Sequence, residues 1–216
     1  MEETVNREPN NTGMRSVYVP CPENDLGSSE QFIGNFLGEG GDLNHVVKNK
    51  IWIVSDTHFC HKNILVYEAA NRPFKDRDEM NEAMIQRWNE KVNDTDIVLH
   101  LGDFSFGNKT RIKNIVSRLN GRICLLLGNH DREQHYDWKE LGFSKTIKYP
   151  FLLDNKFVFS HEPLETIPDG LVNIYGHVHG SKYFNTIDSN RLCACVERWN
   201  CAPIEYDYIK GLFKVV

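Results

Sequence analysis

Five short groups of residues suited to metal binding or acid–base chemistry follow apolar runs in the middle of the chain. In order they are Asp56-Thr57-His58, Gly102-Asp103, Gly128-Asn129-His130-Asp131, Ser160-His161 and Gly176-His177-Val178-His179-Gly180. Each apolar run predicts a buried strand, at about 51–54, 97–101, 123–127, 157–159 and 171–175. In open α/β sheets, ligands bind just past the C-terminal ends of such strands. We therefore expect seven candidate ligands to converge on one sheet edge.

The residue types in these groups favour a centre with two metal ions. Imidazole and carboxylate together suit manganese, iron, zinc or nickel. Two neighbouring ions need a bridging ligand, and Asp103 is the natural candidate because Gly102 lets the backbone turn tightly beneath it. Such a centre clamps a phosphoryl group and generates hydroxide at neutral pH. The alternative is that the histidines are scattered core or surface residues, but five ordered groups, each after a strand, argue against this.

Taken together, the groups resemble the motif set of the calcineurin-like metallophosphoesterases, from about residue 50 to the C-terminus. The resemblance implies an α/β fold of four layers (αββα), in which a two-sheet β-sandwich is flanked by helices. It also implies two divalent metal ions, whose native identity among the four metals stays open. One ion would be held by Asp56, His58, Asp103 and His179, and the other by Asp103, Asn129, His161 and His177.

The resemblance also implies catalytic roles for two neighbouring residues. His130 resembles the general acid beside the leaving group, and Asp131 the residue that polarises it. Residues 58–64 and 71–74 further resemble a subgroup of small bacterial and phage phosphoesterases.

Two residues in these last segments are candidates for substrate contact, namely His61 and Arg72. The alternative is that His61 caps the following helix and that Arg72 makes a surface ion pair. Asn63 is a second candidate for the cap. Cys60, between two histidines, is a possible but disfavoured metal ligand.

The 216-residue length suits one α/β domain with an extension. Residues 1–48 form a polar extension expected to be loosely ordered, and residues 49–216 form the catalytic domain. We expect deletion of residues 1–42 to leave the fold and the hydrolysis largely intact. Helices are predicted after His58 to about 70, and over about 76–92, 110–119 and 132–142. Short strands over 145–149, 151–153, 156–160, 171–175 and 192–196 predict a second sheet packed on the first.

Composition narrows the partners and the compartment. A formal net charge of -5 argues mildly against coating of nucleic acid, which needs a basic surface. No apolar run reaches the length of a membrane span and no secretory signal is visible, so we expect a cytoplasmic protein without a membrane partner. The 6 cysteines are expected to be reduced, with Cys124 in the core and Cys193 and Cys195 on one face of a strand.

These observations favour a metal-dependent phosphoesterase acting on small phosphate esters. Diesters are favoured over monoesters because no long insertion caps the site and few Lys or Arg lie beside the motifs. A phosphomonoesterase and a nuclease using the same site are the alternatives within this class. A non-catalytic binding scaffold is the alternative from another class, although such scaffolds usually lose ligands that this chain retains. The oligomeric state is left open.

Overall fold

The first of two β-sheets begins directly after the N-terminal extension. The computed structural model describes residues 25–28, 49–133 and 136–213. The sheet has the order β10-β1-β2-β3-β4, in which β1 to β4 are parallel and β10 is antiparallel to β1. The strands are β1 (Ile51–Val54), β2 (Ile97–His100), β3 (Arg122–Leu126), β4 (Lys145–Ile147) and β10 (Ile204–Glu205).

The predicted second sheet is present in the C-terminal half of the chain. Its order is β5-β6-β7-β9-β8, with β6, β7 and β9 parallel. The strands are β5 (Phe151–Leu153), β6 (Phe157–Phe159), β7 (Val172–Tyr175), β8 (Ile187–Asp188) and β9 (Arg191–Cys193). The strand predicted over 192–196 corresponds to β9, which ends at Cys193. It is followed by a 3-10 turn, η3 (Val196–Arg198).

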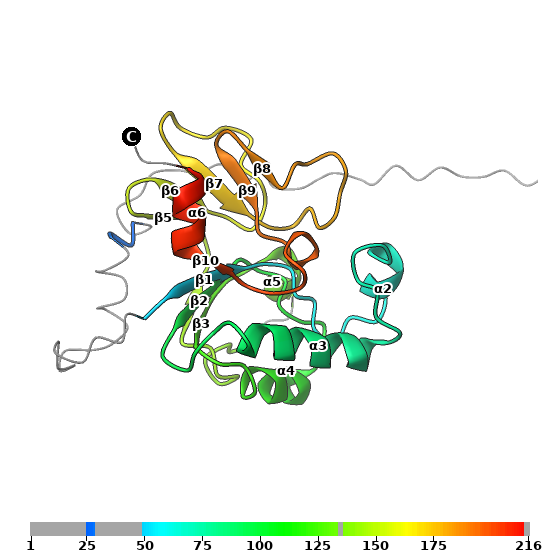
Figure 1. Ribbon diagram of the computed structural model, residues 1–216. Helices are drawn as coiled ribbons and strands as arrows, with labels where there is room; N and C mark the ends of the chain where they lie inside the picture. The colour runs from blue at the N-terminus through cyan, green and yellow to red at the C-terminus, as the bar shows by residue number, and fades with distance from the viewer. Residues whose placement is uncertain (1–24, 29–48, 134–135, 214–216) are drawn as a thin grey trace, which may run out of the picture.

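The two sheets pack face to face, which confirms the predicted sandwich (Figure 1). Alternate residues of β1 point to opposite sides, so Ile51 and Ile53 enter the core between the sheets while Trp52 and Val54 face the helices. Cys124, as predicted, is buried in the core between the sheets. In the described chain, the outer face of the second sheet is covered by loop residues such as Leu164 rather than by a helix.

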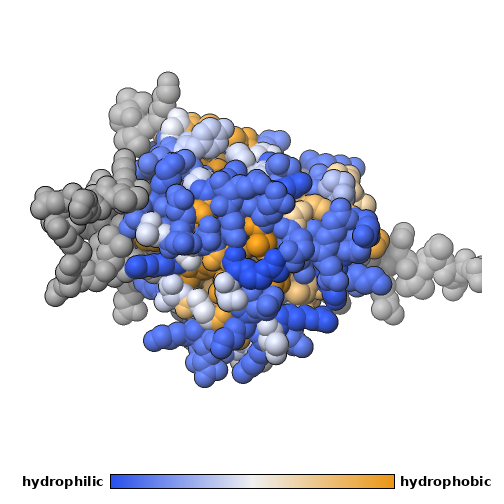
Figure 2. Space-filling view, turned by 60° about the horizontal axis from the view of Figure 1, so that its bottom comes forward, coloured by the Kyte–Doolittle hydropathy of each residue, from blue (hydrophilic) through white to orange (hydrophobic). Residues whose placement is uncertain are grey.

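Two helices cover the outer face of the first sheet, namely α3 (Arg77–Asn89) and α4 (Lys109–Val116) (Figure 1). Helix α3 begins at Asp76, whose side chain accepts hydrogen bonds from two backbone N–H groups of the first turn. Met80, Met84 and Trp88 of α3 are buried and pack in the core between this helix and the first sheet. The side of the molecule that carries α3 and α4 is mainly hydrophilic, with smaller apolar areas (Figure 2).

The remaining helices are short: α2 (Ile64–Tyr67), α5 (Asn129–Glu133) and α6 (Tyr206–Leu212). The predicted helix over 132–142 is wrong, because α5 begins earlier and residues 138–142 form turns. The Asp131 side chain accepts from Gly128 N at 3.0 Å, which starts the helix at Asn129. No helix in the described residues is long and apolar enough to cross a membrane.

One segment of the N-terminal extension pairs with the second sheet. Leu26 N donates to Leu152 O at 3.0 Å, and Asp154 N donates to Gly27 O at 2.9 Å. Leu26 also packs against the core between the sheets. Residues 25–28 are the part of the predicted extension 1–48 that the structure describes, and the prediction of loose order for the rest of it lies outside the described residues.

Candidate metal centre

All seven predicted ligands lie at the C-terminal ends of parallel strands, and they come from both sheets. Loops after β1, β2 and β3 supply Asp56, His58, Asp103 and Asn129, and loops after β6 and β7 supply His161, His177 and His179. The sheets meet at this end. Ser55 N donates to Ala194 O and Val196 N to Ser55 O, both at 3.1 Å, so the end of β1 is joined to the end of β9.

The first group of side chains is Asp56, His58 and His179, whose ligand atoms all lie within 4.8 Å of one another. Asp56 Oδ1 is 3.8 Å from His58 Nε2 and 3.8 Å from His179 Nε2. Asp56 and His58 are buried, and His179 is half-buried. The two rings therefore direct one nitrogen each toward the same carboxylate oxygen.

The second group is Asp103, His161 and His177, with Asn129 among them. Asn129 Oδ1 lies 2.9 Å from His161 Nε2 and 3.1 Å from His177 Nδ1. The Nδ1 atom of His161 faces Leu101 O at 2.8 Å, which leaves Nε2 directed into the group. His177 is exposed, so this group opens to solvent.

Asp103 lies between the two groups. Its Oδ2 is 3.5 Å from His58 Nε2 in the first group, and its Oδ1 is 3.6 Å from His161 Nε2 in the second. Burial and the charges of Asp56 and Asp131 raise the pKa of Asp103 to about 9. A cation placed between the groups would relieve this crowding of carboxylates.

The backbone is held in an uncommon conformation at five of the seven predicted ligands. Asp56, His58, Asp103, His177 and His179 have φ angles of 57°, 49°, 56°, 69° and 49°. Non-glycine residues rarely adopt this left-handed conformation, and clusters of such residues mark functional sites. Gly102 has a φ of 107°, and a Cβ there would lie 2.6 Å from Gly128 N, so only glycine fits below Asp103.

The chemistry of the unpaired atoms fits a metal ion. Asp56 Oδ1 and His58 Nε2 are buried and have no hydrogen-bond partner. Burial lowers the pKa of His58 and of His161 to about 4, so both rings are in the neutral form that binds metals. Two ligands with bonds of about 2.1 Å to one ion lie roughly 3 to 3.5 Å apart. The separations of 3.5 and 3.6 Å across Asp103 are close to this range.

Comparison with known proteins agrees with this geometry. The family model for calcineurin-like phosphoesterases matches residues 49–201. The chain belongs to the calcineurin-like phosphoesterase family. Membership of this family makes the protein a metal-dependent phosphoesterase, and the two Asp/His groups are its candidate sites for divalent ions.

Several relatives of this phosphoesterase match most of its length. An uncharacterized protein of Methanocaldococcus jannaschii is 33% identical over 174 residues, which cover 76% of this chain and 92% of the relative. The Gene 66 protein of a Mycobacterium phage is 33% identical over 174 residues, covering 66% and 85%. The crystal structure of a protein of unknown function from Aquifex aeolicus has a TM-score of 0.60 at 25% identity, covering 76% of this chain and 100% of that one.

Sequence reasoning missed one buried residue of this phosphoesterase, Glu197 in η3. Its side chain is fully buried, and Oε1 lies 3.0 Å from His179 Nδ1. The hydrogen bond to Glu197 and the nearby Asp56 outweigh the effect of burial and raise the pKa of His179 to about 9. A carboxylate behind a histidine fixes the ring and leaves Nε2 free for a metal. No local motif marks Glu197, because its partners are distant in sequence.

Arg72 has a different place from the one expected. Its side chain is fully buried, and Nη2 lies 2.6 Å from Glu197 Oε1. The guanidinium also donates to Thr57 O at 2.8 Å and to Asp56 O at 2.6 Å. Neither a direct substrate contact nor a surface ion pair fits this burial. Arg72 instead holds the backbone of the first motif against Glu197.

The Asp131 carboxylate binds backbone N–H groups instead of the expected partner, His130. Asp131 is buried, and its carboxylate accepts hydrogen bonds from the backbone N–H groups of Asp103, Phe104 and Gly128 at 2.6, 3.0 and 3.0 Å. Adjacent residues in a helix do not face each other, so the two side chains of α5 diverge. Asp131 therefore ties the loop after β2 to the start of α5. His130 lies at the mouth of the centre, with Nε2 3.9 Å from Asp103 Oδ2.

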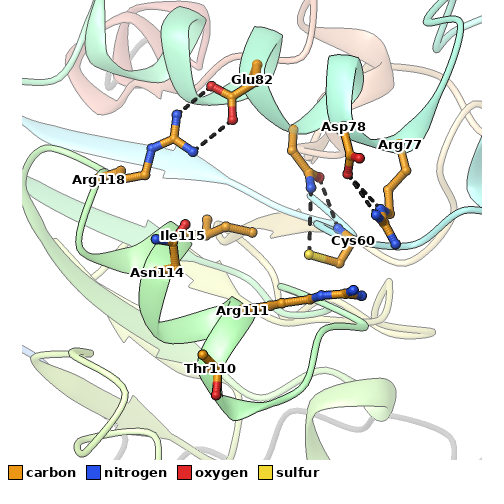
Figure 3. A pocket seen from close by; sticks show the side chains of 10 residues that line it. Cys60, Arg77, Asp78, Glu82, Thr110, Arg111, Asn114, Ile115 and Arg118 are labelled. Atoms are coloured by element: carbon orange, nitrogen blue, oxygen red, sulfur yellow. Dashed lines mark hydrogen bonds and ion pairs between the residues drawn. The ribbon is translucent and has the colours of Figure 1, made fainter.

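The segment after His58 has one side toward the centre and one side toward α3. His61 Nδ1 is 3.3 Å from His58 Nδ1, so His61 lies beside the predicted ligands. The side chain of Asn63 makes no capping hydrogen bond. Cys60 faces away from the centre, and its Sγ accepts a hydrogen bond from the Asn81 side chain. Cys60 lines a hollow of about 360 Å³ between α3 and α4 (Figure 3). A metal-ligand role for Cys60 does not fit this placement.

Proposed function

We propose that this phosphoesterase hydrolyses small phosphodiesters with two divalent ions held by the seven predicted ligands. The observation that carries the proposal is Asp103, whose two oxygens face one histidine from each group. When bound, the ions supply positive charge to phosphoryl oxygens and lower the pKa of water. Manganese, iron, zinc and nickel all suit these ligands, and ligand chemistry alone does not choose among them.

Residues of the chain supply the proton donor and hold the predicted ligands in position. His130, whose side chain is 36% exposed, lies within reach of a substrate at the mouth of the centre. It is placed to protonate the leaving oxygen, as a positioned imidazole does in general acid catalysis. Glu197 and Arg72 act beneath the centre by holding His179 and the loop of Asp56 in place.

The charges around the centre favour a diester over a monoester. A monoester dianion gains most from additional cations around the phosphate. Arg72 is committed to Glu197, and the side chain of Arg132 donates to Lys148 O at 3.3 Å. Lys62, Arg72 and Arg132 are the cations that lie close to the motifs in sequence, and two of them, Arg72 and Arg132, are therefore engaged elsewhere. The open side of the centre at His177 leaves room for the second substituent of a diester.

The decisive comparison is kcat/KM for bis(p-nitrophenyl) phosphate and for p-nitrophenyl phosphate, measured with manganese. We expect the diester to be preferred by tenfold or more, which corresponds to about 1.4 kcal/mol in transition-state binding. Asp103→Ala should abolish both reactions. A tenfold preference for the monoester would reverse the proposal and indicate a phosphatase.

A further inference from the structure

A group of aromatic side chains stands beside the candidate metal centre. Phe106 stacks on His61 with ring centroids 3.9 Å apart and an interplanar angle of 16°. The ring of Tyr67 lies edge-on to that of His61, with ring centroids 6.4 Å apart. Phe106 is 40% exposed and Tyr67 is 70% exposed. Two aromatic residues are therefore held in contact with water at the edge of the centre.

The backbone fixes Phe106 in this position. Phe106 N donates to Phe59 O at 2.9 Å, and the hydroxyl of Ser105 donates to the same carbonyl at 2.9 Å. The neighbouring rings of Phe59 and Phe104 are fully buried and anchor this loop in the core. Phe106 itself is not needed to fill the core, because a large part of its ring is outside it.

Phe106 lies close to the place where the ester bond would be broken. Its ring centroid is 5.2 Å from that of His58, a predicted ligand, and 4.7 Å from that of His130, the proposed acid. A group that leaves beside His130 therefore departs next to Phe106. An exposed ring at this point can contact a substituent of the leaving group through an apolar, polarizable surface.

We infer that Phe106, supported by His61, is a stacking surface for a planar ring in the substrate, so that the substrate class is nucleoside phosphate esters. This inference rests on the proposed function, since it uses the same centre. Stacking of a base on an aromatic side chain strengthens binding by about five- to 150-fold and tolerates any base. A single platform of this kind selects a nucleotide over a sugar phosphate without reading its sequence.

The test compares two phosphate ligands that differ in the base, AMP and ribose 5-phosphate. Their dissociation constants are measured by calorimetry on the full chain with manganese. We expect AMP to bind about tenfold or more tightly than ribose 5-phosphate. Phe106→Leu keeps an apolar side chain but removes the ring, and it should reduce the ratio to about twofold or less while leaving ribose 5-phosphate unaffected. Tyr208→Leu, which removes an exposed ring on α6, is the matched control and should keep the full ratio.

Two results would overturn the inference. Equal binding of AMP and ribose 5-phosphate to the unaltered protein would show that no ring is recognised. An undiminished ratio in Phe106→Leu would place the recognition elsewhere. Hydrolysis of bis(p-nitrophenyl) phosphate by the same preparations separates this inference from the proposed function. If the protein hydrolyses the diester but does not bind AMP more tightly than ribose 5-phosphate, only the stacking surface is contradicted. If it prefers AMP but does not hydrolyse the diester, only the proposed function is contradicted.

Discussion

At the scale of single residues, His130 is the side chain whose proposed role differs most from the roles proposed for its neighbours. It lies at the mouth of the centre, while Asn129 faces His161 and His177. His130→Gln should retain the metal ions but lower kcat by roughly a hundred- to ten-thousand-fold. The loss should be greatest for substrates with poor leaving groups, which depend most on a proton donor. Steady-state kinetics over a series of leaving groups measures this.

A second variant separates catalysis from metal binding. His179→Ala removes a ring of the first group and should lose metal and turnover together. If His130→Gln instead lost its metal, the division of roles between His130 and the predicted ligands would be wrong.

Glu197 offers a prediction about a positioning residue. Glu197→Gln removes the charge that faces Arg72 and weakens the hold on His179 Nδ1. We expect metal affinity to fall by about 10- to 100-fold in a competition assay with a chelator. The free energy of unfolding should also fall by about 3–5 kcal/mol, because a buried arginine loses its partner.

The control for Glu197 is Glu205, a half-buried glutamate whose ion-pair partner is exposed. Glu205→Gln breaks the pair with Lys50 at 3.0 Å. The change should cost at most about 1 kcal/mol, since exposed ion pairs contribute little. Equal metal affinity in Glu197→Gln and in the unaltered protein would contradict the role assigned to Glu197.

At the scale of secondary-structure elements, one carboxylate joins the loop after β2 to α5. Asp131→Ala leaves three backbone N–H groups without their acceptor. Each buried unpaired group costs about 1–3 kcal/mol, so we expect a loss of at least about 3 kcal/mol in metal-free protein. Urea unfolding of the variant measures the loss.

Asp137 provides the comparison for Asp131. It accepts from Lys139 N at 3.0 Å in an exposed turn, so water replaces the carboxylate when it is removed. Asp137→Ala should therefore lose about 1 kcal/mol or less. A loss of that size in Asp131→Ala would show that the loop after β2 is held in some other way.

The elements differ in how far the sequence predicts them. Apolar runs located every strand that carries a predicted ligand, because burial between two layers leaves a clear pattern in the chain. The helix over 132–142 was mispredicted because the Asp131 side chain, which no periodicity reports, starts α5 at Asn129. Arg72 and Glu197 could not be paired from sequence, because 125 positions separate them. Arg72 and Glu197 are assigned a positioning role because both side chains are buried, which only the structure shows.

At the scale of the whole molecule, the segment 25–28 extends the second sheet at β5. A chain that begins at residue 25 keeps the two hydrogen bonds of this segment, and a chain that begins at residue 29 loses them. We expect the shorter chain to be less stable by about 1–3 kcal/mol in urea unfolding. Identical midpoints for the two chains would show that the pairing contributes nothing.

Metal content tests the centre as a unit. Elemental analysis of gently purified protein should find two divalent ions per chain. A chelator should lower the melting temperature by roughly 5–10 °C, because binding at a hundredfold excess over Kd stabilises by about 2.7 kcal/mol. Asp103→Ala should show no such metal-dependent shift. Only trace metal, with no activity restored by manganese, would exclude a two-metal centre.

The contact between Asp56 and His177 has a consequence for the time at which the protein becomes active. His177 N donates to Asp56 Oδ2 at 2.8 Å across 121 positions of the chain. A ribosome that adds about 5–20 residues per second needs about 6–24 s to synthesise that stretch. During this interval, the first motif has been synthesised but still lacks its partners from the second sheet. We therefore expect hydrolytic activity only after β7 has been synthesised, and chains that stop before β7 should be inert toward phosphate esters.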